Sequence, residues 1–342
     1  MSVASAFRSR FTSIRHIIPA STPPFRLACN LYRQVPSANE TSNAATPPPP
    51  MIFTHANGFH KEIWEPVISR LNPRWASGDM YAFDCRNHGD SAVLNKNILP
   101  DVFDWYWQAT DILQVVDTFG LKKPIAVGHS ILAELMRPGT FSAIIAVDPT
   151  MFPNTIYICA PLADNPMGQL TLKRRDAWKD RFPTELRHLI LPYLNSAEAK
   201  ATMLQKSFFN VWHPEVLDVY TEHGLLDVVK DDGSTGVVLK CPKFQEAVTF
   251  ACIGSGIYDA YERLNEVTIP VHLIVGETSD INHPDLVQMK FERCQRGSVD
   301  VVENAGHLVS LEKPQETATS MSAFLERLFG SQSAEEGHKA RL

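Results

Sequence analysis

The stretch Ile125-Ala-Val-Gly128-His129-Ser130-Ile131 is an apolar run of the kind that forms a buried strand, and it stops at Gly-X-Ser. A strand that turns sharply into a helix at such a point exposes the serine hydroxyl above the edge of a sheet. Serine is a weak nucleophile at neutral pH, so it needs a base, and the base needs an acid to hold its tautomer. The stretch therefore predicts that Ser130 is a nucleophile with a base and an acid elsewhere in the chain.

Candidates for the base and the acid lie after other expected strands. His307 follows the last of these strands in the pair Gly306-His307, where a loop can bring its ring back over the serine. Asp280 follows the preceding strand and is the first choice for the acid, and Asp148, at the end of another strand, is the alternative. The order Ser, Asp, His along the chain is that of the α/β-hydrolase fold and not that of the chymotrypsin or subtilisin types.

An acyl transfer reaction also requires donors for the oxyanion of its transition state. The segment Thr54-His-Ala-Asn57-Gly-Phe follows the first core strand. In the fold that the triad order indicates, a backbone N–H from this loop pairs with the N–H of the residue after the nucleophile. We therefore expect Asn57 and Ile131 to form the oxyanion hole, an assignment that rests on their positions.

Further short apolar runs predict an α/β fold with a mostly parallel central sheet and helices on both faces. These runs are Met51 to His55, Met80 to Asp84, Ala143 to Val147, Val271 to Val275 and Val299 to Val302, with one or two earlier strands in Phe25 to Val35. Residues 150–255 lack this alternation and are expected to form an inserted helical cap. The core would then comprise residues 1–149 and 256–330, followed by a flexible tail at 331–342.

Two helices are clear from their apolar periodicity. One follows Asp101, which would cap it, and closes at Gly120. The other runs from about Pro314 to Phe329, with Gly330 as its stop.

Composition excludes several classes of function. The 342 residues are 44% hydrophobic and 20% charged, and the net charge of -6 favours neither nucleic acid nor an anionic membrane as a partner. No apolar stretch reaches the ~18 residues of a transmembrane helix. The six scattered cysteines show no metal-binding spacing and suit a reducing compartment, and no cofactor motif is present. We expect a soluble intracellular protein without a metal or cofactor.

The two ends of the chain carry different address signals. The final Ala340-Arg341-Leu342 fits the small-basic-leucine form of the peroxisomal signal and would be bound by the peroxisomal import receptor. The first 39 residues contain five arginines and no acidic residue, which suits a mitochondrial presequence. The peroxisome is the favoured location, with the mitochondrion or the cytosol as alternatives.

Seven motifs in a fixed order resemble the α/β-hydrolase superfamily, and in particular the group that includes the yeast peroxisomal lipase and hydrolases of fungal toxin biosynthesis. They are His55-Ala-Asn-Gly-Phe with Trp64, Asp84-Cys-Arg-Asn-His88-Gly89-Asp-Ser91, Gly128-His-Ser130, Val147-Asp-Pro149, Ser207-Phe-Phe, Val275-Gly-Glu, and Gly306-His307 with Glu312 and Pro314. The resemblance implies a Ser-His-Asp esterase or lipase with a helical cap, acting on a small hydrophobic acyl substrate.

The chain departs from this family directly after Ser130. Leu132 stands where the family has glycine, and only Ile131 to Met136 separate the serine from Arg137-Pro138, where the family has a helix of about a dozen residues. A parallel crossover needs about a dozen residues to return across the sheet. The shortened segment supports an alternative function, that of a catalytically impaired hydrolase-fold protein that binds a small molecule or partner.

Overall fold

An eight-stranded sheet forms the centre of the molecule, with the strand order β1-β2-β4-β3-β5-β6-β9-β10. The computed structural model describes residues 3–36, 47–128, 131–154, 195–229, 233–251 and 255–330. β2 pairs antiparallel with β1 and β4, and all the other pairs in this sheet are parallel. The predicted α/β fold with a mostly parallel sheet is therefore confirmed.

The strands match the apolar runs of the sequence. The sheet contains β1 (Phe11–Pro19), β2 (Arg26–Gln34), β3 (Met51–Thr54), β4 (Met80–Phe83), β5 (Ile125–Val127), β6 (Ala143–Val147), β9 (Val271–Gly276) and β10 (Gly297–Val302). The Arg-rich segment that suits a presequence contains β1 and β2, which pair with each other along the whole length of β1 and are part of the fold. Within the described residues, no helix combines the length and the apolar character that crossing a membrane requires.

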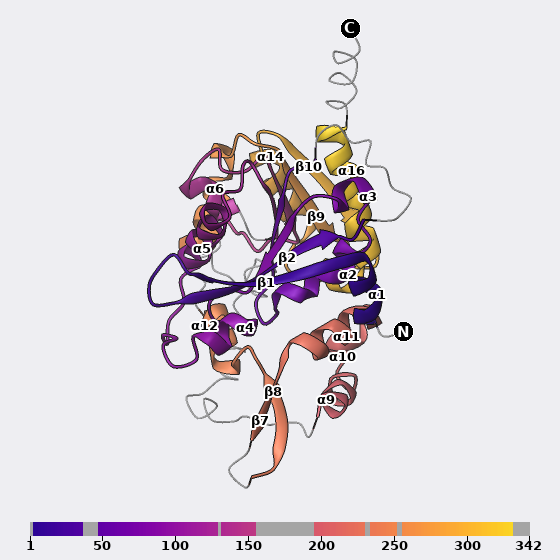
Figure 1. The fold of residues 1–342 in the computed structure, drawn as a ribbon. Helices are drawn as coiled ribbons and strands as arrows, with labels where there is room; N and C mark the ends of the chain where they lie inside the picture. Colours follow the sequence, from indigo (N-terminus) through magenta and orange to yellow (C-terminus); the bar gives the residue numbers. More distant parts are fainter. Residues whose placement is uncertain are drawn as a thin grey trace, which may run out of the picture.

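Helices cover both faces of the sheet (Figure 1). One face packs against α1 (Val3–Arg10), η1 (Lys61–Trp64), α2 (Glu65–Ile68), α3 (Pro73–Ala76), α11 (Pro214–His223), α15 (Val309–Glu312) and α16 (Pro314–Phe329). The other packs against α5 (Trp105–Thr118), α6 (Ile131–Met136), α13 (Ser255–Glu262), η3 (Leu264–Glu266) and α14 (Pro284–Arg293).

Successive side chains of each strand point to opposite faces of the sheet, and this alternation gives rise to the two cores. In β3, Met51 and Phe53 belong to the first core and Ile52 belongs to the second. All three side chains are completely buried, because successive side chains of a strand point to opposite faces and both faces are covered.

The two predicted helices are present, with one correction. The helix α16 has the predicted bounds Pro314–Phe329. The helix α5 is capped by Asp104 and not by Asp101, because the Asp104 carboxylate accepts the hydrogen bond of the Tyr106 N–H. Asp104 directly precedes the first turn, so its carboxylate can reach the free N–H groups there.

The described parts of the predicted cap lie at one end of the molecule, at the bottom of Figure 1. They contain α9 (Ser196–Met203), α10 (Ser207–Asn210), α11, the antiparallel hairpin β7 (Leu225–Val229) with β8 (Thr235–Leu239), and α12 (Lys243–Ala251). A short helix α4 (Gly89–Leu94) follows β4 in the core. The predicted tail, including Ala340, Arg341 and Leu342, lies outside the described residues.

Candidate active site

Asp148 is the first residue after β6, and its side chain is completely buried. Its φ of +43° lies in the left-handed region that non-glycine residues rarely adopt, so neighbouring contacts must hold it there. Three donors from the end of β9 and the loop after it reach the carboxylate: the Gly276 N–H at 3.0 Å, the Ser279 hydroxyl at 2.7 Å and the Asn282 amide at 2.9 Å. These donors give the carboxylate a fixed orientation.

His307 lies against this carboxylate. Its Nδ1 is 2.5 Å from Oδ2 of Asp148, and 28% of its side-chain surface is exposed to solvent. A neutral imidazole that donates through Nδ1 has its lone pair on Nε2, the form that a general base requires. Gly306 shapes the loop before His307. Its N–H donates to the Glu312 carboxylate at 2.7 Å, and a Cβ at this position would stand too close to the same carboxylate.

The structure thus brings His307 together with Asp148, the alternative acid of the sequence interpretation. Asp280, the first choice, is exposed in the loop whose Ser279 and Asn282 donate to Asp148. Both aspartates follow strands that end at the same edge of the sheet, which is why their positions in the sequence resemble each other. Ser279 and Asn282 are site residues that sequence reasoning did not identify.

The turn after β5 is the predicted nucleophile position. His129 and Ser130 lie outside the described residues, so the turn is defined by its neighbours. Gly128 has a φ of +105°, and a Cβ there would stand 2.3 Å from the Thr54 carbonyl oxygen. Only glycine fits this close approach of β5 to the end of β3. Ile131 begins α6, which is six residues long and ends at Met136, as the short crossover in the sequence indicated.

The loop predicted to supply the second oxyanion donor is held by two histidines. The Gly58 N–H donates to Nε2 of His88 at 2.9 Å, and the Cys85 N–H donates to Nε2 of His55 at 3.0 Å. Burial lowers the pKa of His55, and burial followed by the nearby His55 lowers the pKa of His88 well below its ordinary value. Both rings are therefore neutral and can accept these bonds. Asn57, the predicted donor, lies directly before Gly58.

The cap also contacts this loop. The Asn57 side-chain amide donates to the Glu246 carbonyl oxygen at 3.1 Å, which links the loop to α12. The Glu246 side chain lies beside Gly58, since a Cβ at that glycine would stand 2.9 Å from its Oε1. Burial raises the pKa of Glu246 to about 7, an effect that Lys243 partly offsets.

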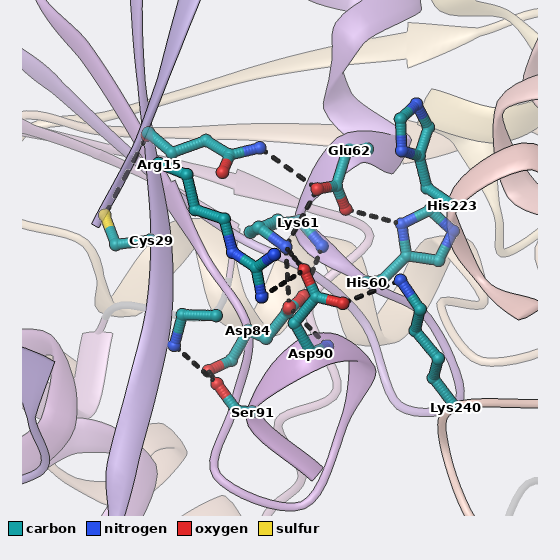
Figure 2. Close-up of polar contacts among 12 residues, drawn as sticks. Arg15, Cys29, His60, Lys61, Glu62, Asp84, Asp90, Ser91, His223 and Lys240 are labelled. Atoms are coloured by element: carbon teal, nitrogen blue, oxygen red, sulfur yellow. Dashed lines mark hydrogen bonds and ion pairs between the residues drawn. The ribbon is translucent and has the colours of Figure 1, made fainter. Parts of the chain in front are cut away.

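A buried ionic cluster is centred on Lys61, which follows the loop in the chain (Figure 2). The ammonium of Lys61, which has no exposed side-chain surface, lies 2.8 Å from Glu62 and 2.9 Å from both Asp84 and Asp90. Burial alone would lower the pKa of Lys61, but the carboxylates of Asp84, Glu62 and Asp90 raise it overall. Lys240, after β8, bonds Asp90 at 2.6 Å and connects the cluster to the cap. A buried lysine has no local sequence signal, so this cluster was not predicted.

A small cavity borders the nucleophile turn. It has a volume of about 50 Å³ and is lined mainly by apolar side chains of α5, α6, α13 and the segment after Asp148. Gly128 and Ile131, the residues on either side of His129-Ser130, both line it. At 10–15 Å³ for each water-sized group, it has room for roughly four such groups. Among the described residues, no cluster of three or more His, Cys, Asp or Glu side chains could hold a metal ion.

Known proteins share the sequence pattern and the fold. The family model described as alpha/beta hydrolase family matches residues 51–320. The peroxisomal membrane protein LPX1 of Saccharomyces cerevisiae is 24% identical over 295 residues, which cover 77% of this chain and 71% of that protein. The abhydrolase domain-containing protein ACTT2-1 of Alternaria alternata is 26% identical over 245 residues, 60% of this chain and 85% of that protein.

Solved structures show the same architecture. The peroxisomal alpha-beta-hydrolase Lpx1 of Saccharomyces cerevisiae superposes with a TM-score of 0.74 at 20% identity, covering 94% of this chain and 90% of that one. E-2-(acetamidomethylene)succinate hydrolase gives a TM-score of 0.64 at 19% identity, covering 92% and 99%. An esterase from Thermogutta terrifontis gives 0.60 at 16% identity, covering 92% and 98%.

Proposed function

Because the chain belongs to the alpha/beta hydrolase family, we propose that it is a serine hydrolase that cleaves the ester of a small hydrophobic acyl group through an acyl-enzyme. The observation that carries the proposal is the 2.5 Å contact between Nδ1 of His307 and the buried Asp148 carboxylate. This pair supplies the base and the acid of a triad, and Ser130 is the nucleophile that the sequence provides. Asp148 takes the acid role in place of Asp280.

In the first half of the reaction, Nε2 of His307 takes the proton of the Ser130 hydroxyl as its oxygen attacks the acyl carbonyl carbon. The carbonyl oxygen becomes an anion, which the N–H groups of Asn57 and Ile131 stabilise. Asp148 holds the imidazole tautomer and stabilises the imidazolium. The ester C–O bond then breaks, and the leaving alcohol takes the proton from His307.

In the second half, a water molecule replaces the alcohol. His307 takes a proton from the water, whose oxygen attacks the acyl-enzyme carbonyl. The serine ester bond breaks, the proton returns to the Ser130 oxygen, and the carboxylic acid leaves. All the groups required are side chains and backbone N–H groups of this chain.

The cavity beside Gly128 supports an acyl group. Its walls are mainly apolar, which suits an acyl group better than a polar one. Two structural neighbours, an esterase and a hydrolase of a succinate derivative, agree with a small acyl substrate. Haloalkane dehalogenases also share the fold, but relatives of that type use an aspartate where this chain has Ser130.

A fluorophosphonate probe tests the proposal directly. We expect the folded protein to be labelled at Ser130, located by peptide mass spectrometry, and the variant Ser130→Ala to remain unlabelled. A p-nitrophenyl ester series from acetate to decanoate should show its highest kcat/KM at the short end. Absence of labelling at Ser130 in protein that retains its native circular dichroism would overturn the proposal.

A catalytically impaired binding protein remains the second candidate, because α6 has only six residues and Leu132 occupies the position of a family glycine. A buried branched side chain at that position can displace the Ile131 N–H, and a displacement of about 1 Å can cost on the order of a hundredfold in rate. If this candidate is correct, an inserted Ser-X-Gly-Gly segment creates esterase activity that the natural chain lacks. If the natural site works, the insertion does not raise its rate.

The peroxisome is the proposed location, supported by Ala340-Arg341-Leu342 and by the similarity to the peroxisomal membrane protein LPX1. A fluorescent protein fused to the N-terminus of the chain should colocalise with a peroxisomal marker and become diffuse when the last three residues are deleted. Mitochondrial or cytosolic signal from the full-length fusion would support the alternatives instead.

A further inference from the structure

Lys290 is a completely buried lysine on α14, behind the Asp148 carboxylate. Its Nζ donates to the Pro149 carbonyl oxygen at 2.7 Å and to the Asn282 side-chain oxygen, and it lies 5.6 Å from the centre of the Phe152 ring. Burial lowers the pKa of Lys290 to about 7, although the nearby Asp148 charge opposes this effect. A buried amine is costly, so an apolar side chain would suit a purely structural position better.

Both acceptors of Lys290 belong to the immediate surroundings of Asp148. Pro149 is the next residue in the chain, and its carbonyl group follows the strained φ of Asp148. Asn282 donates its amide nitrogen to Oδ2 of Asp148, the oxygen that also bonds Nδ1 of His307. Lys290 therefore contacts the backbone on one side of the acid and the amide that binds the carboxylate on the other.

Lys290 reinforces the orientation of the Asn282 amide. An asparagine side chain has one accepting oxygen and one donating NH₂ group, which can exchange places by rotation about the last bond. The Asp148 carboxylate can only accept, and the Lys290 amine donates whether or not it is protonated. The two neighbours together require the observed orientation. Without the lysine donor, only the carboxylate would favour this orientation, and the Asn282 amide would be held less firmly against Asp148.

We propose that Lys290 is a positioning residue of the active site: through Asn282 and the Pro149 carbonyl, it fixes the Asp148 carboxylate that orients His307. This proposal rests on the proposed function for its catalytic consequence, but its structural part concerns the Asp148–His307 pair alone. Lys290 itself touches neither substrate nor reacting atoms. Its loss should therefore affect the alignment of the base and not the binding of the acyl group.

Lys290→Met and Asn282→Ala test this relay. We expect each substitution to lower kcat about tenfold to a hundredfold with little change in KM, since loss of alignment acts on the chemical step. The double variant should be no slower than Lys290→Met, because the loss of Lys290 already releases Asn282. Methionine is unbranched and similar in length to lysine but carries no amine, so Lys290→Met is expected to fold. Asn282→Ala provides an independent second variant.

Arg293→Met on the same helix is the matched control. Its guanidinium bonds Glu262 at 3.1 Å and packs over Tyr261. The Arg293→Met variant should be less stable than the unsubstituted protein but have the same kcat. An unchanged kcat in Lys290→Met, or effects of the two single variants that multiply in the double variant, would overturn the relay.

A readout independent of turnover separates this proposal from the proposed function. The proton between His307 Nδ1 and Asp148 should give a downfield NMR signal in the unsubstituted protein, and this signal should broaden through exchange with water in Lys290→Met but not in Arg293→Met. If the protein hydrolyses no ester and this difference is still observed, the proposed function fails and the positioning role stands. If the signal is the same in both variants, the positioning role fails, whatever the activity.

Discussion

The backbone N–H of Gly58 donates a 2.9 Å hydrogen bond to Nε2 of His88. Gly58 has a φ of +88° and follows Asn57, the proposed oxyanion donor, so this bond fixes the conformation of the loop where the oxyanion is expected. His88 can accept the bond because its buried ring is neutral. The oxyanion loop is therefore held from the segment after β4, which provides no group to the reaction itself.

His88→Ala should release this loop. We expect kcat for a short p-nitrophenyl ester to fall on the order of tenfold to a hundredfold, because the Asn57 N–H is no longer held towards the oxyanion, with little change in KM. His16→Ala, on the edge strand β1 and outside the site, is the matched control and should leave kcat unchanged. Equal kcat values for the two variants would show that His88 does not support the loop.

The choice of acid is tested by two matched substitutions. Asp148→Asn keeps the shape of the side chain but removes the charge that holds the His307 tautomer, so we expect kcat to fall about 10⁴-fold, the loss typical of this change in a serine triad. Asp280→Asn at the exposed position should retain kcat within about threefold. Steady-state kinetics of both variants decides between them, and the reverse result would restore Asp280 as the acid.

Lys61→Met should destabilise the protein strongly. The substitution leaves Asp84, which has no exposed surface, without its buried cation, and such losses cost about 3–5 kcal/mol in free energy of unfolding. Urea denaturation measures the change. Lys240→Met is the control, because it removes only the partly exposed end of the cluster at Asp90 and should cost clearly less. Similar losses for the two variants would contradict the central role of Lys61.

Glu65→Gln should make stability less dependent on pH. Burial, followed by the nearby Glu62, raises the pKa of Glu65 from 4.5 to about 8 in the folded protein. The folded state therefore binds this proton more tightly, and the associated stability is present below about pH 4.5 and lost as the pH rises towards 8. Glutamine keeps the oxygen that accepts from Tyr32 but cannot ionise.

The free energy of unfolding of Glu65→Gln should consequently exceed that of the unsubstituted protein at pH 8, by up to a few kcal/mol, and approach it at pH 5. Denaturation curves at the two pH values measure this difference. The exposed Glu316→Gln serves as the control and should show no such pH-dependent gain. A constant difference between pH 5 and pH 8 would rule out the ionisation of Glu65 as its cause.

Glu246→Gln should change the alkaline side of the activity profile. The Glu246 carboxyl group, whose pKa is raised to about 7, is neutral below this pH and negative above it, beside Gly58 of the oxyanion loop. The negative charge opposes the developing oxyanion, so kcat of the unsubstituted enzyme should decline above pH 7 severalfold relative to the variant. Measurements of kcat from pH 5.5 to 9 test this, and parallel profiles would contradict it.

Much of the fold follows from patterns that are local in the sequence. The apolar runs at Ile125 and Ala143 predict strands, and the spacing of apolar residues in Pro314–Phe329 predicts a helix, because each pattern reflects the period of one element. The predicted N-cap residue of α5 was wrong by three positions. Asp101 and Asp104 are both suitable capping residues, and only the path of the chain before the helix decides which carboxylate meets the free N–H groups.

The sequence by itself determined the type of fold and the position of Ser130 after a central strand, since both follow from patterns of neighbouring residues. Only the tertiary structure decided that His307 meets Asp148, because 159 residues separate the two and both candidate acids follow strands at the same sheet edge. The burial of Lys61 and Lys290 was decided in the same way. Their cost is offset by carboxylates and carbonyl groups from other segments, and such contacts exist only when the sheet, its loops and the helices around it have come together.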